Sequence, residues 1–387
     1  MRVLWVSHAA GLGGAELALA EGVAALAERG IETHVLLPRE GPLRERLSTA
    51  AAIHVVPYNG WANAPSIWAA MRWVAHDVLK ARGTVASLAR QLDVDLCVTN
   101  TVILPVGALA ARSARIPHAW FIHEFGSDEH GVRFLLGVEA TLRIVNRLSE
   151  VVIVNSEALH SYLASWVHAE KLSLVRYAVN VPALSVSTPL TQKPFRLILV
   201  GAKAPGKGQA EAIKAVGVLA DRGLDIDLEL VGDGASAYED ELRRLSEECG
   251  VTRRVRFIPF DANPFERMAR SHVVLMCSRR EAFGRVTVEA MKLGKPVVGA
   301  ASGGTLDLVR PGWNGLLYRP GDPEDLAARI EELIRDPEAV RLMGERGRTW
   351  ACKTFTASAY GAALKAVFEK ALSRRLEATG PPRTRMP

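Results

Sequence analysis

Cysteine is scarce in this sequence of 387 residues, which contains four of them. They lie far apart and form no CxxC pair, so their spacing argues against a structural zinc site and against a disulfide framework. The four are Cys97, Cys249, Cys277 and Cys352. Because disulfides persist mainly in oxidising compartments, this cysteine usage predicts a cytoplasmic protein.

Long hydrophobic runs are also missing from the sequence. No stretch approaches the roughly 18–20 uninterrupted apolar residues that a helix needs to cross a bilayer. The first apolar run covers only Val3–Val6 before Ser7 and His8, which is too short for the core of a signal peptide. We therefore expect any contact with a membrane to be peripheral.

Neither positive nor negative residues form blocks in the sequence before the C-terminal tail. The chain has 48 Lys and Arg against 42 Asp and Glu, a net charge of +6 and a pI of about 9.2. This excess favours anionic partners such as nucleotides or phospholipid headgroups, while the scatter gives no indication of nucleic acid binding. An apolar content of 49% over 387 residues predicts a globular protein with two domains.

What the sequence does contain is an alternation of short apolar runs and helical patterns. It opens with the run Val3–Val6, a glycine loop at 11–14 and a helical pattern that ends at Gly30. Further strands are predicted at 34–37, 53–56, 96–99, 118–123 and 151–155. Helical segments separate these strands, which predicts a parallel sheet with helices on both faces.

From residue 181 the rhythm gives way to a segment rich in Pro, Ser and Thr, and then restarts. The second set of strands is predicted at 197–201, 227–231, 255–258, 273–277 and 296–299. We therefore predict an α/β protein with two Rossmann-like, doubly wound domains, residues 1–185 and 194–355, facing across a cleft. Residues 356–376 are expected to form a helix that packs back on the N-terminal domain, and residues 377–387 a disordered tail.

The most informative motif is S-R-R-E-A-F-G-R-V-T-V-E-A-M at residues 278–291. A predicted strand ends before it and a helix begins near Gly284, so the amides at the helix start are free to bind an anion. These amides belong to Phe283, Gly284, Arg285 and Val286. Glu281 precedes the helix and Glu289 lies on it, where each carboxylate can accept hydrogen bonds from hydroxyls. A nucleotide sugar carries a diphosphate between two hydroxyl-bearing groups, so this motif predicts a nucleotide-sugar site. The alternative is an ordinary helix start whose acidic side chains face solvent.

A second glycine loop, residues 201–208, joins a predicted strand to a helix and carries Lys203 and Lys207. A lysine in that position can neutralise a diphosphate, although a plain surface lysine would also fit. Gly232, in the turn that follows the next predicted strand, is placed to let backbone amides approach a ligand.

Two features of the N-terminal half stand at the ends of predicted strands. Gly13 and Gly14 form a strand-to-helix turn whose amides could meet a phosphate. His123 stands at the carboxyl edge of the strand predicted at 118–123, where a lone histidine is more often structural than functional.

Together these segments resemble the family-four retaining glycosyltransferases of the GT-B fold, also described as glycosyl transferases group 1. Residues 278–291 are similar to the E-x7-E motif of that family, and residues 201–208 to its G-R-x-x-x-x-K-G loop. Residues 232–234 resemble its G-D-G turn, and residues 13–16 its G-G-A-E segment. The resemblance spans residue 1 to about residue 350.

The resemblance implies roles for these residues. Glu281 would face the sugar hydroxyls, Glu289 the ribose, and Lys207 the donor phosphates. Gly13 and Gly14 would meet the donor phosphate from the N-terminal domain. His123 matches the family's histidine facing the sugar, so the expected catalytic residues are His123, Lys207 and Glu281.

Two positions depart from the family pattern. Ala202 stands where the family has arginine, so either Lys203 takes over its role or the phosphates are neutralised less strongly. Residues 176–180 read R-Y-A-V-N where the family commonly has P-N-G-V-D, which removes a glycine from that loop.

The implied reaction is transfer of a sugar, with retention, from a nucleoside diphosphate sugar to an acceptor hydroxyl of a glycan or lipid-linked acceptor. Such an activity would serve polysaccharide, glycolipid or other glycoconjugate biosynthesis. No cofactor or metal is expected, because no clear DxD pair stands at a strand end and Lys207 with the helix-start amides can stabilise the leaving diphosphate. A GT-B sugar-nucleotide epimerase and a non-catalytic nucleotide-binding relative remain as alternatives.

Residues 62–90 form a predicted helical stretch that combines tryptophan with cations. Four apolar residues recur at helical spacing and predict a stripe that faces the core: Ile67, Met71, Val74 and Val78. Trp68, Ala75 and Leu79 lie beside this stripe. The stretch is either a broad buried face or a surface that brings the protein to anionic lipid at the inner face of the membrane.

Overall fold

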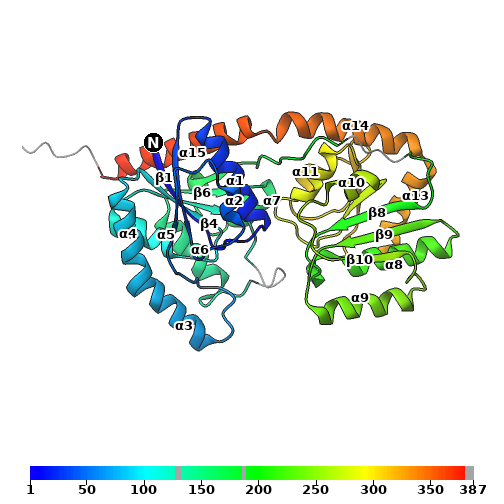
Figure 1. Ribbon diagram of the computed structural model, residues 1–387, viewed down its shortest axis with the longest axis horizontal. Coiled ribbons are helices and arrows are strands. Elements are labelled where there is room, and N and C mark those ends of the chain that lie inside the picture. Colours follow the sequence, from blue (N-terminus) through cyan, green and yellow to red (C-terminus); the bar gives the residue numbers. More distant parts are fainter. Residues whose placement is uncertain (127–131, 185–188, 380–387) are drawn as a thin grey trace, which may run out of the picture. The chain divides into compact units, whose positions relative to one another are not determined.

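The computed structural model describes residues 1–126, 132–184 and 189–379, and the chain divides into two compact units (Figure 1). The first unit comprises Met1–Ala178 together with the C-terminal segment from Thr356, and the second comprises Val179–Phe355. The division thus falls at Ala178, before the expected domain end at residue 185.

The first unit contains a seven-stranded parallel sheet with strand order β3-β2-β1-β4-β5-β6-β7. The strands are β1 (Arg2–Val6), β2 (Glu32–Leu37), β3 (Ala52–Val55), β4 (Leu96–Asn100), β5 (His118–Ile122), β6 (Val151–Val154) and β7 (Leu172–Leu174). In the register, Val3 of β1 lies opposite both Thr33 of β2 and Leu96 of β4. The strand order reverses between β1 and β4, and ligands bind at such a switch point in doubly wound sheets.

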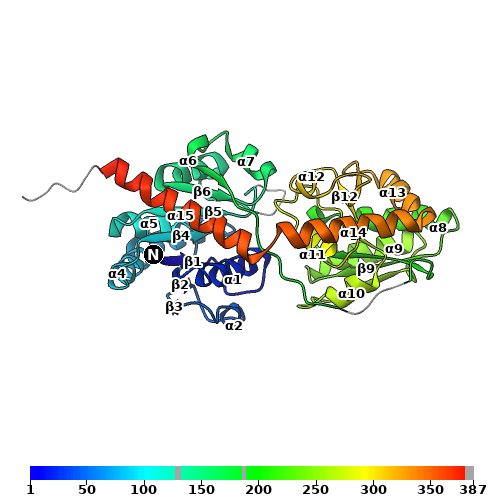
Figure 2. The ribbon, with the colours of Figure 1, turned by 90° about the horizontal axis from the view of Figure 1, so that it is seen from above.

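Helices connect these strands in the first unit. They are α1 (Gly14–Ala27), α2 (Leu43–Arg46), α3 (Ile67–His76), the π-helical turn η1 (Asp77–Ala81), α4 (Arg82–Gln91), α5 (Val106–Ala114), α6 (Gly137–Leu148), α7 (Glu157–Leu163) and the 3-10 turn η3 (Ala169–Lys171). The C-terminal helix α15 (Ala357–Thr379) belongs to the same unit (Figure 2), where Tyr360 Oη donates to Ala18 O of α1 at 3.1 Å. Residues 377–379, expected in the tail, are therefore helical, and the rest of that tail lies outside the described residues.

The second unit contains a six-stranded parallel sheet with strand order β10-β9-β8-β11-β12-β13. The strands are β8 (Phe195–Val200), β9 (Ile226–Val231), β10 (Val255–Ile258), β11 (Val273–Met276), β12 (Val297–Ala300) and β13 (Gly315–Tyr318). The helical elements are η4 (Pro205–Lys207), α8 (Gln209–Asp221), α9 (Ser236–Glu248), α10 (Phe265–Arg270), α11 (Arg285–Lys292), α12 (Thr305–Leu308), α13 (Pro323–Arg335) and α14 (Pro337–Thr354). Here the order reverses between β8 and β11, which is the second switch point.

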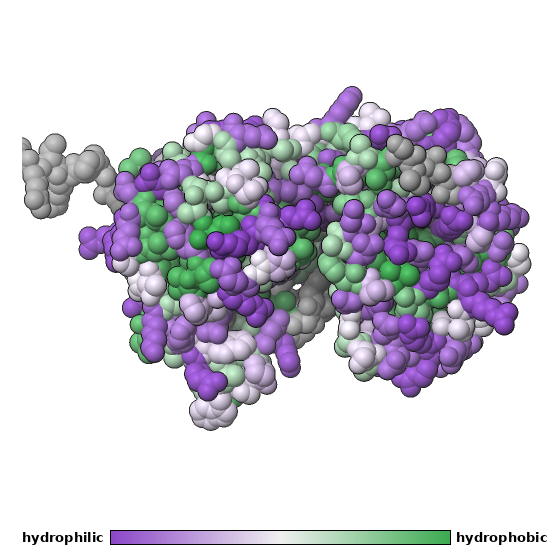
Figure 3. All heavy atoms as spheres, in the orientation of Figure 1, coloured by the Kyte–Doolittle hydropathy of each residue, from purple (hydrophilic) through white to green (hydrophobic). Residues whose placement is uncertain are grey.

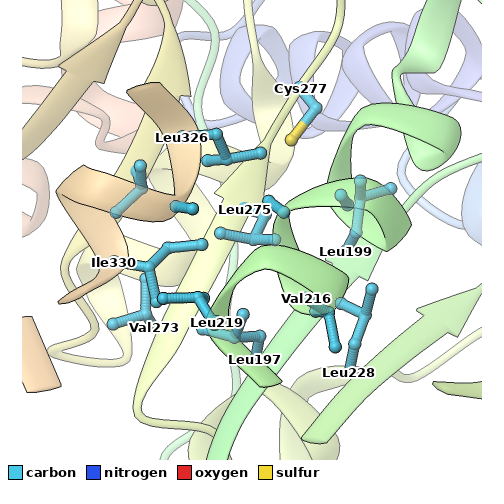
Figure 4. Close-up of a cluster of buried hydrophobic side chains, with 14 of the residues drawn as sticks. Leu197, Leu199, Val216, Leu219, Leu228, Val273, Leu275, Cys277, Leu326 and Ile330 are labelled. Carbon is cyan, nitrogen blue, oxygen red and sulfur yellow. The ribbon is translucent and has the colours of Figure 1, made fainter. Parts of the chain in front are cut away.

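The core of the second unit holds its strands and helices in place (Figure 4). Leu197 and Leu199 of β8 and Leu275 of β11 are buried with Val216 of α8 and Ile330 of α13. Each buried side chain of this size contributes about 1.5–3 kcal/mol relative to an exposed one. Because both strands at the switch point are fixed by this core, the loops that leave their carboxyl ends are fixed as well.

The stretch predicted at 62–90 is helical from Ile67, but the predicted core stripe is only partly buried, because Val74 and Val78 are half-buried and its first two residues are exposed. Ile67 and Met71 are 57% and 42% exposed, and Trp68 and Leu79 are both 77% exposed. Instead Asp77 is buried, where its carboxylate accepts a hydrogen bond from Asn59 N at 3.0 Å. In the part of the chain that the structure describes, no helix is both long and apolar enough to span a membrane.

Candidate active site

Four loops meet at the carboxyl ends of strands in the second unit: residues 201–208, 232–234, 277–284 and 301–304. Backbone hydrogen bonds join them. Arg279 N donates to Gly206 O at 3.0 Å, and Gly304 N donates to Glu281 O at 2.6 Å. Lys203 N donates to Asp233 O at 2.7 Å. The loops predicted from separate motifs therefore form one site at the switch point of this sheet.

Glycine permits this close approach at two of the loops. Gly208 has a φ of 73°, and a Cβ there would lie 2.2 Å from Cys277 O. Gly232 has a φ of 141°, and a Cβ there would lie 2.2 Å from Gly201 O. Any side chain at either position would push the loops apart, so Gly232 shapes the site through its backbone.

Lys207 and Glu281 form the charged centre of this site. Lys207 Nζ lies 2.9 Å from Glu281 Oε2, and the two side chains are 35% and 17% exposed. The attraction of the Glu281 carboxylate raises the pKa of Lys207, so the ammonium stays charged at neutral pH. Both groups are accessible to a ligand, and they offer it one cation and one hydrogen-bond acceptor.

The start of α11 lies next to Glu281 in the chain and has the predicted form. Gly284 is its N-cap with a φ of 90°, and the first helical hydrogen bond runs from Thr287 N to Gly284 O at 2.9 Å. The amides of Gly284, Arg285 and Val286 precede that bond and stand at the start of the helix, where backbone N–H groups can face an anion. Phe283 contributes only its backbone, because its buried ring packs against Phe355.

Two of the predicted site residues are held by ion pairs inside the second unit. Glu289 is buried on α11, where its Oε1 lies 2.9 Å from Arg285 Nε. Lys203 Nζ lies 2.8 Å from Glu239 Oε2 and donates to Ile258 O at 3.2 Å, and its side chain is 2% exposed. The structure therefore uses Lys203 to tie the loop to α9 and β10, and does not offer its ammonium in place of the arginine missing at Ala202.

In the first unit, His123 lies in a buried network at the strand ends. Asn155 Nδ2 donates to Tyr177 Oη at 2.6 Å, so this hydroxyl directs its own proton to His123 Nδ1. His123 Nε2 then carries the ring proton and donates it to Asn100 Oδ1 at 2.7 Å. Burial lowers the pKa of His123 to about 3, so the ring is neutral and both of its nitrogens have partners within the unit.

Sequence reasoning missed the partners of His123. Asn100 ends β4 and Asn155 follows β6, so their polar side chains at strand ends could have indicated a site there. Tyr177 gave no such signal, because it lies in the loop at 176–180 that departs from the family pattern.

The glycine turn of the first unit is occupied by a carboxylate. Gly13 is the N-cap of α1 and Gly14 its first residue. A Cβ on Gly13 would lie 2.6 Å from Glu16 Oε2, so the Glu16 side chain folds back over the helix start. Glu16 Oε1 lies 3.0 Å from His8 Nε2, a residue that sequence reasoning also missed. A negative charge thus stands where a donor phosphate was expected.

Within the described residues, no three His, Cys, Asp or Glu side chains gather into a group that could hold a metal ion. The expectation of a metal-free reaction stays a prediction.

Two doubly wound units, one of them with a lysine and a helix start at its switch point, are the architecture of the GT-B glycosyltransferases. The family model described as Glycosyltransferase Family 4 matches residues 12–181, and that described as Glycosyl transferases group 1 matches residues 181–350. Together the two matches cover residues 12–350. The chain belongs to this glycosyltransferase family, which confirms the resemblance and the predicted fold.

Individual relatives agree with this assignment. D-inositol 3-phosphate glycosyltransferase of Corynebacterium glutamicum is 34% identical over 182 residues, which are 45% of this chain and 43% of that protein. An uncharacterized glycosyltransferase of Methanocaldococcus jannaschii is 28% identical over 255 residues, 64% of this chain and 67% of that protein. The matched part is therefore less than half of the Corynebacterium protein.

A solved structure matches over nearly the whole chain. The Anabaena protein Alr3699/HepE in complex with UDP-glucose has a TM-score of 0.76 and 26% sequence identity. The match covers 95% of this chain and 100% of that chain.

Proposed function

We propose that the protein is a retaining glycosyltransferase that moves a sugar from a nucleoside diphosphate sugar to an acceptor hydroxyl. The observation that carries this proposal is the Lys207–Glu281 pair, 2.9 Å apart, beside the start of α11. An ammonium and the amides of a helix start bind a diphosphate well, and a carboxylate accepts hydrogen bonds from sugar hydroxyls. The UDP-glucose bound by the Anabaena relative supports a UDP-sugar as the first donor to test.

The chemistry assigned to the site needs no cofactor and no metal. Lys207 and the amides of Gly284, Arg285 and Val286 stabilise the negative charge that develops on the leaving diphosphate. Glu281 orients the sugar through its hydroxyls. Retention at the anomeric carbon is proposed from the family resemblance, and the acceptor is a glycan or a lipid-linked molecule of glycoconjugate biosynthesis.

The surface of α3 and η1 supports peripheral contact with the inner face of a membrane. Four exposed apolar side chains lie there: Ile67, Trp68, Met71 and Leu79. Exposed cations accompany them at Arg72, Lys80 and Arg82, while the one acidic residue between positions 62 and 90, Asp77, is buried. Figure 3 shows pale and green side chains over α3, and purple ones over much of both units. Apolar groups bordered by cations fit an anionic lipid surface, where a lipid-linked acceptor would be found.

A donor screen tests the proposed function. Thermal unfolding is recorded with UDP, GDP, ADP and their glucose or mannose conjugates, because a ligand that binds only the folded state stabilises it by RT ln(1 + [L]/Kd). We expect one nucleotide series to raise the midpoint, with the free diphosphate and the sugar conjugate both effective. Absence of stabilisation by any of them would contradict the proposal, and rearrangement or release of the sugar without an acceptor would favour an epimerase.

A further inference from the structure

Three basic residues lie side by side at the amino ends of strands in the second unit. The sheet order places β8, β11 and β12 next to one another. Counted back from the first pairs of their register, Arg196, His272 and Lys295 stand opposite one another. Hydrogen bonds join the first two, because Arg196 N donates to His272 Nδ1 at 2.9 Å and His272 N donates to Arg196 O at 2.8 Å. The row therefore crosses the edge of the sheet opposite to the four loops of the candidate active site.

Lys295 is a buried lysine whose charge is not neutralised. The residue is 9% exposed, and its ammonium forms no hydrogen bond or ion pair with any described residue. Burial lowers the pKa of Lys295 to about 8, and no carboxylate in the described part of the chain raises it. Lys203, the other buried lysine of this unit, lies 2.8 Å from the Glu239 carboxylate. Because buried charges normally have a partner, Lys295 calls for an anion that the described residues do not supply.

Arg196, at the other end of the row, also lacks an ion pair. It lines a cavity of about 610 Å³ between β8, β9, β10 and α10, together with three other arginines and four carboxylates. Each of these carboxylates lies 3.1–3.3 Å from one of the three other arginines. The pairs are Asp227–Arg256, Glu229–Arg256, Asp261–Arg267 and Glu266–Arg270. Within the described residues, the Arg196 guanidinium is thus the cation of this cavity that remains without a carboxylate.

His272, in the middle of the row, shows that the two cations lie close together. Burial lowers the pKa of His272, and the charges of Lys295 and Arg196 lower it further, so both charges act on its ring. The neutral ring already uses both nitrogens, since Nδ1 accepts from Arg196 N and Nε2 lies 3.3 Å from Pro189 O. Neighbouring strands are about 4.8 Å apart, so the long side chains of Arg196 and Lys295 can meet at one anion beside His272.

We propose that Arg196 and Lys295 bind a phosphate group, either free or carried by a small molecule that occupies the cavity beside Arg196. A phosphate monoester has a charge of about −1.5 to −2 at neutral pH, which matches two cations without partners. A guanidinium binds phosphate through a fork of N–H groups, and an ammonium adds a compact charge. Lys207 and the start of α11 lie at the opposite edge of the same sheet, so this second site is independent of the proposed function.

The substitution Lys295→Met tests the site, because methionine keeps a long unbranched side chain and removes the ammonium. Inorganic phosphate and glycerol 3-phosphate are titrated calorimetrically into the wild type and the variant at constant ionic strength. We expect the variant to bind both anions about 10- to 150-fold more weakly, the range for loss of a charge-assisted contact. Its unfolding midpoint should be equal or higher, because a buried charge without a partner is removed.

Two further variants keep the result interpretable. Arg196→Met should weaken phosphate binding to a similar extent, and it tests the site even if Lys295→Met does not fold. Lys353→Met is the matched control, because Lys353 is an exposed lysine on α14 of the same unit. We expect this control to bind phosphate as the wild type does.

The same titrations distinguish the two forms of the ligand and the two sites. Tighter binding of glycerol 3-phosphate than of inorganic phosphate supports a monoester in the cavity, and equal binding supports free phosphate. No measurable binding of either anion by the wild type would overturn the inference, as would equal affinity of the wild type, Lys295→Met and Arg196→Met. Binding that is lost in Lys207→Ala and kept in Lys295→Met would also overturn it, because the phosphate would then occupy the donor site. Failure of the wild type to bind any nucleotide contradicts only the proposed function.

Discussion

At the scale of single residues, the two lysines of loop 201–208 differ in what their ammonium groups contact. The Lys203 side chain forms an ion pair with Glu239 and is 2% exposed. The Lys207 side chain forms an ion pair with Glu281 and is 35% exposed. The sequence identifies both as candidates for a phosphate. It cannot separate them, because the carboxylates that hold them come from α9 and from the loop before α11, far from both lysines in the chain.

Lys207→Ala should weaken UDP binding by about 10- to 150-fold, since a charge-assisted contact contributes about 1.5–3 kcal/mol. Isothermal titration of UDP into the variant and the wild type measures the change. Lys214→Ala is the matched control, because Lys214 is an exposed lysine on the neighbouring helix α8. Equal affinity of the Lys207 variant and the wild type would remove Lys207 from the site.

Glu281→Gln should leave UDP binding at least as strong as in the wild type while greatly reducing transfer. The substitution frees Lys207 from its ion pair, and the lost carboxylate is assigned to the sugar rather than to the phosphates. Comparing the UDP dissociation constant with the rate of UDP release from UDP-glucose in the presence of an acceptor checks both parts. Turnover comparable to the wild type would contradict the role given to Glu281.

Glu124 makes the stability of the protein depend on pH. Burial raises its pKa from 4.5 to about 7, although it accepts a hydrogen bond from Val102 N at 2.9 Å. Because the folded protein favours the protonated Glu124 carboxyl, this carboxyl stabilises the folded state in full below about pH 4.5. The stabilisation of the folded state is lost as the pH rises through about 7. Relative to the wild type, Glu124→Gln should therefore gain ~1–3 kcal/mol of unfolding free energy between pH 5 and pH 8. Urea unfolding at both pH values measures this difference, and an equal difference at the two would contradict the assigned ionisation.

At the scale of elements, the sequence predicts most strands and fails where side-chain contacts decide the geometry. The apolar runs of β1 and β8 and the glycine loops after them are visible in the sequence. The three-residue strand β7 and the strand β13, next to a glycine loop, were missed because their runs are short. The π-helical turn at Asp77 was also beyond prediction, because it accompanies a hydrogen bond to Asn59, 18 residues away.

Replacing Trp68 and Leu79 together by serine should reduce co-sedimentation with vesicles that contain anionic lipid. Both side chains are 77% exposed on the surface of α3 and η1, where they can enter the headgroup region. The control is Leu376→Ser, because Leu376 is 67% exposed on α15 in the same unit. High salt should weaken binding of the wild type as well, since cations on α3 and η1 contribute. Absence of wild-type binding at low salt would end the membrane proposal and favour a soluble acceptor.

At the scale of the whole molecule, the sequence predicts the family and the two doubly wound sheets. The two family models meet at residue 181, close to the division of the chain at Ala178. The site of the second unit was largely predictable, because each loop of it carries its own motif. The network of the first unit was not, because the proton position on His123 depends on Asn100 and Tyr177, which no short motif brings together.

Hydrogen exchange with and without UDP-glucose tests most directly the claim that the second unit binds the donor. We predict slower exchange in peptides that cover residues 201–208 and 281–289, because their amides and Lys207 would contact the diphosphate. Peptides from α9 (Ser236–Glu248), which forms no part of the four site loops, should exchange at an unchanged rate. Protection confined to the first unit, or no protection at saturating UDP-glucose, would contradict the account.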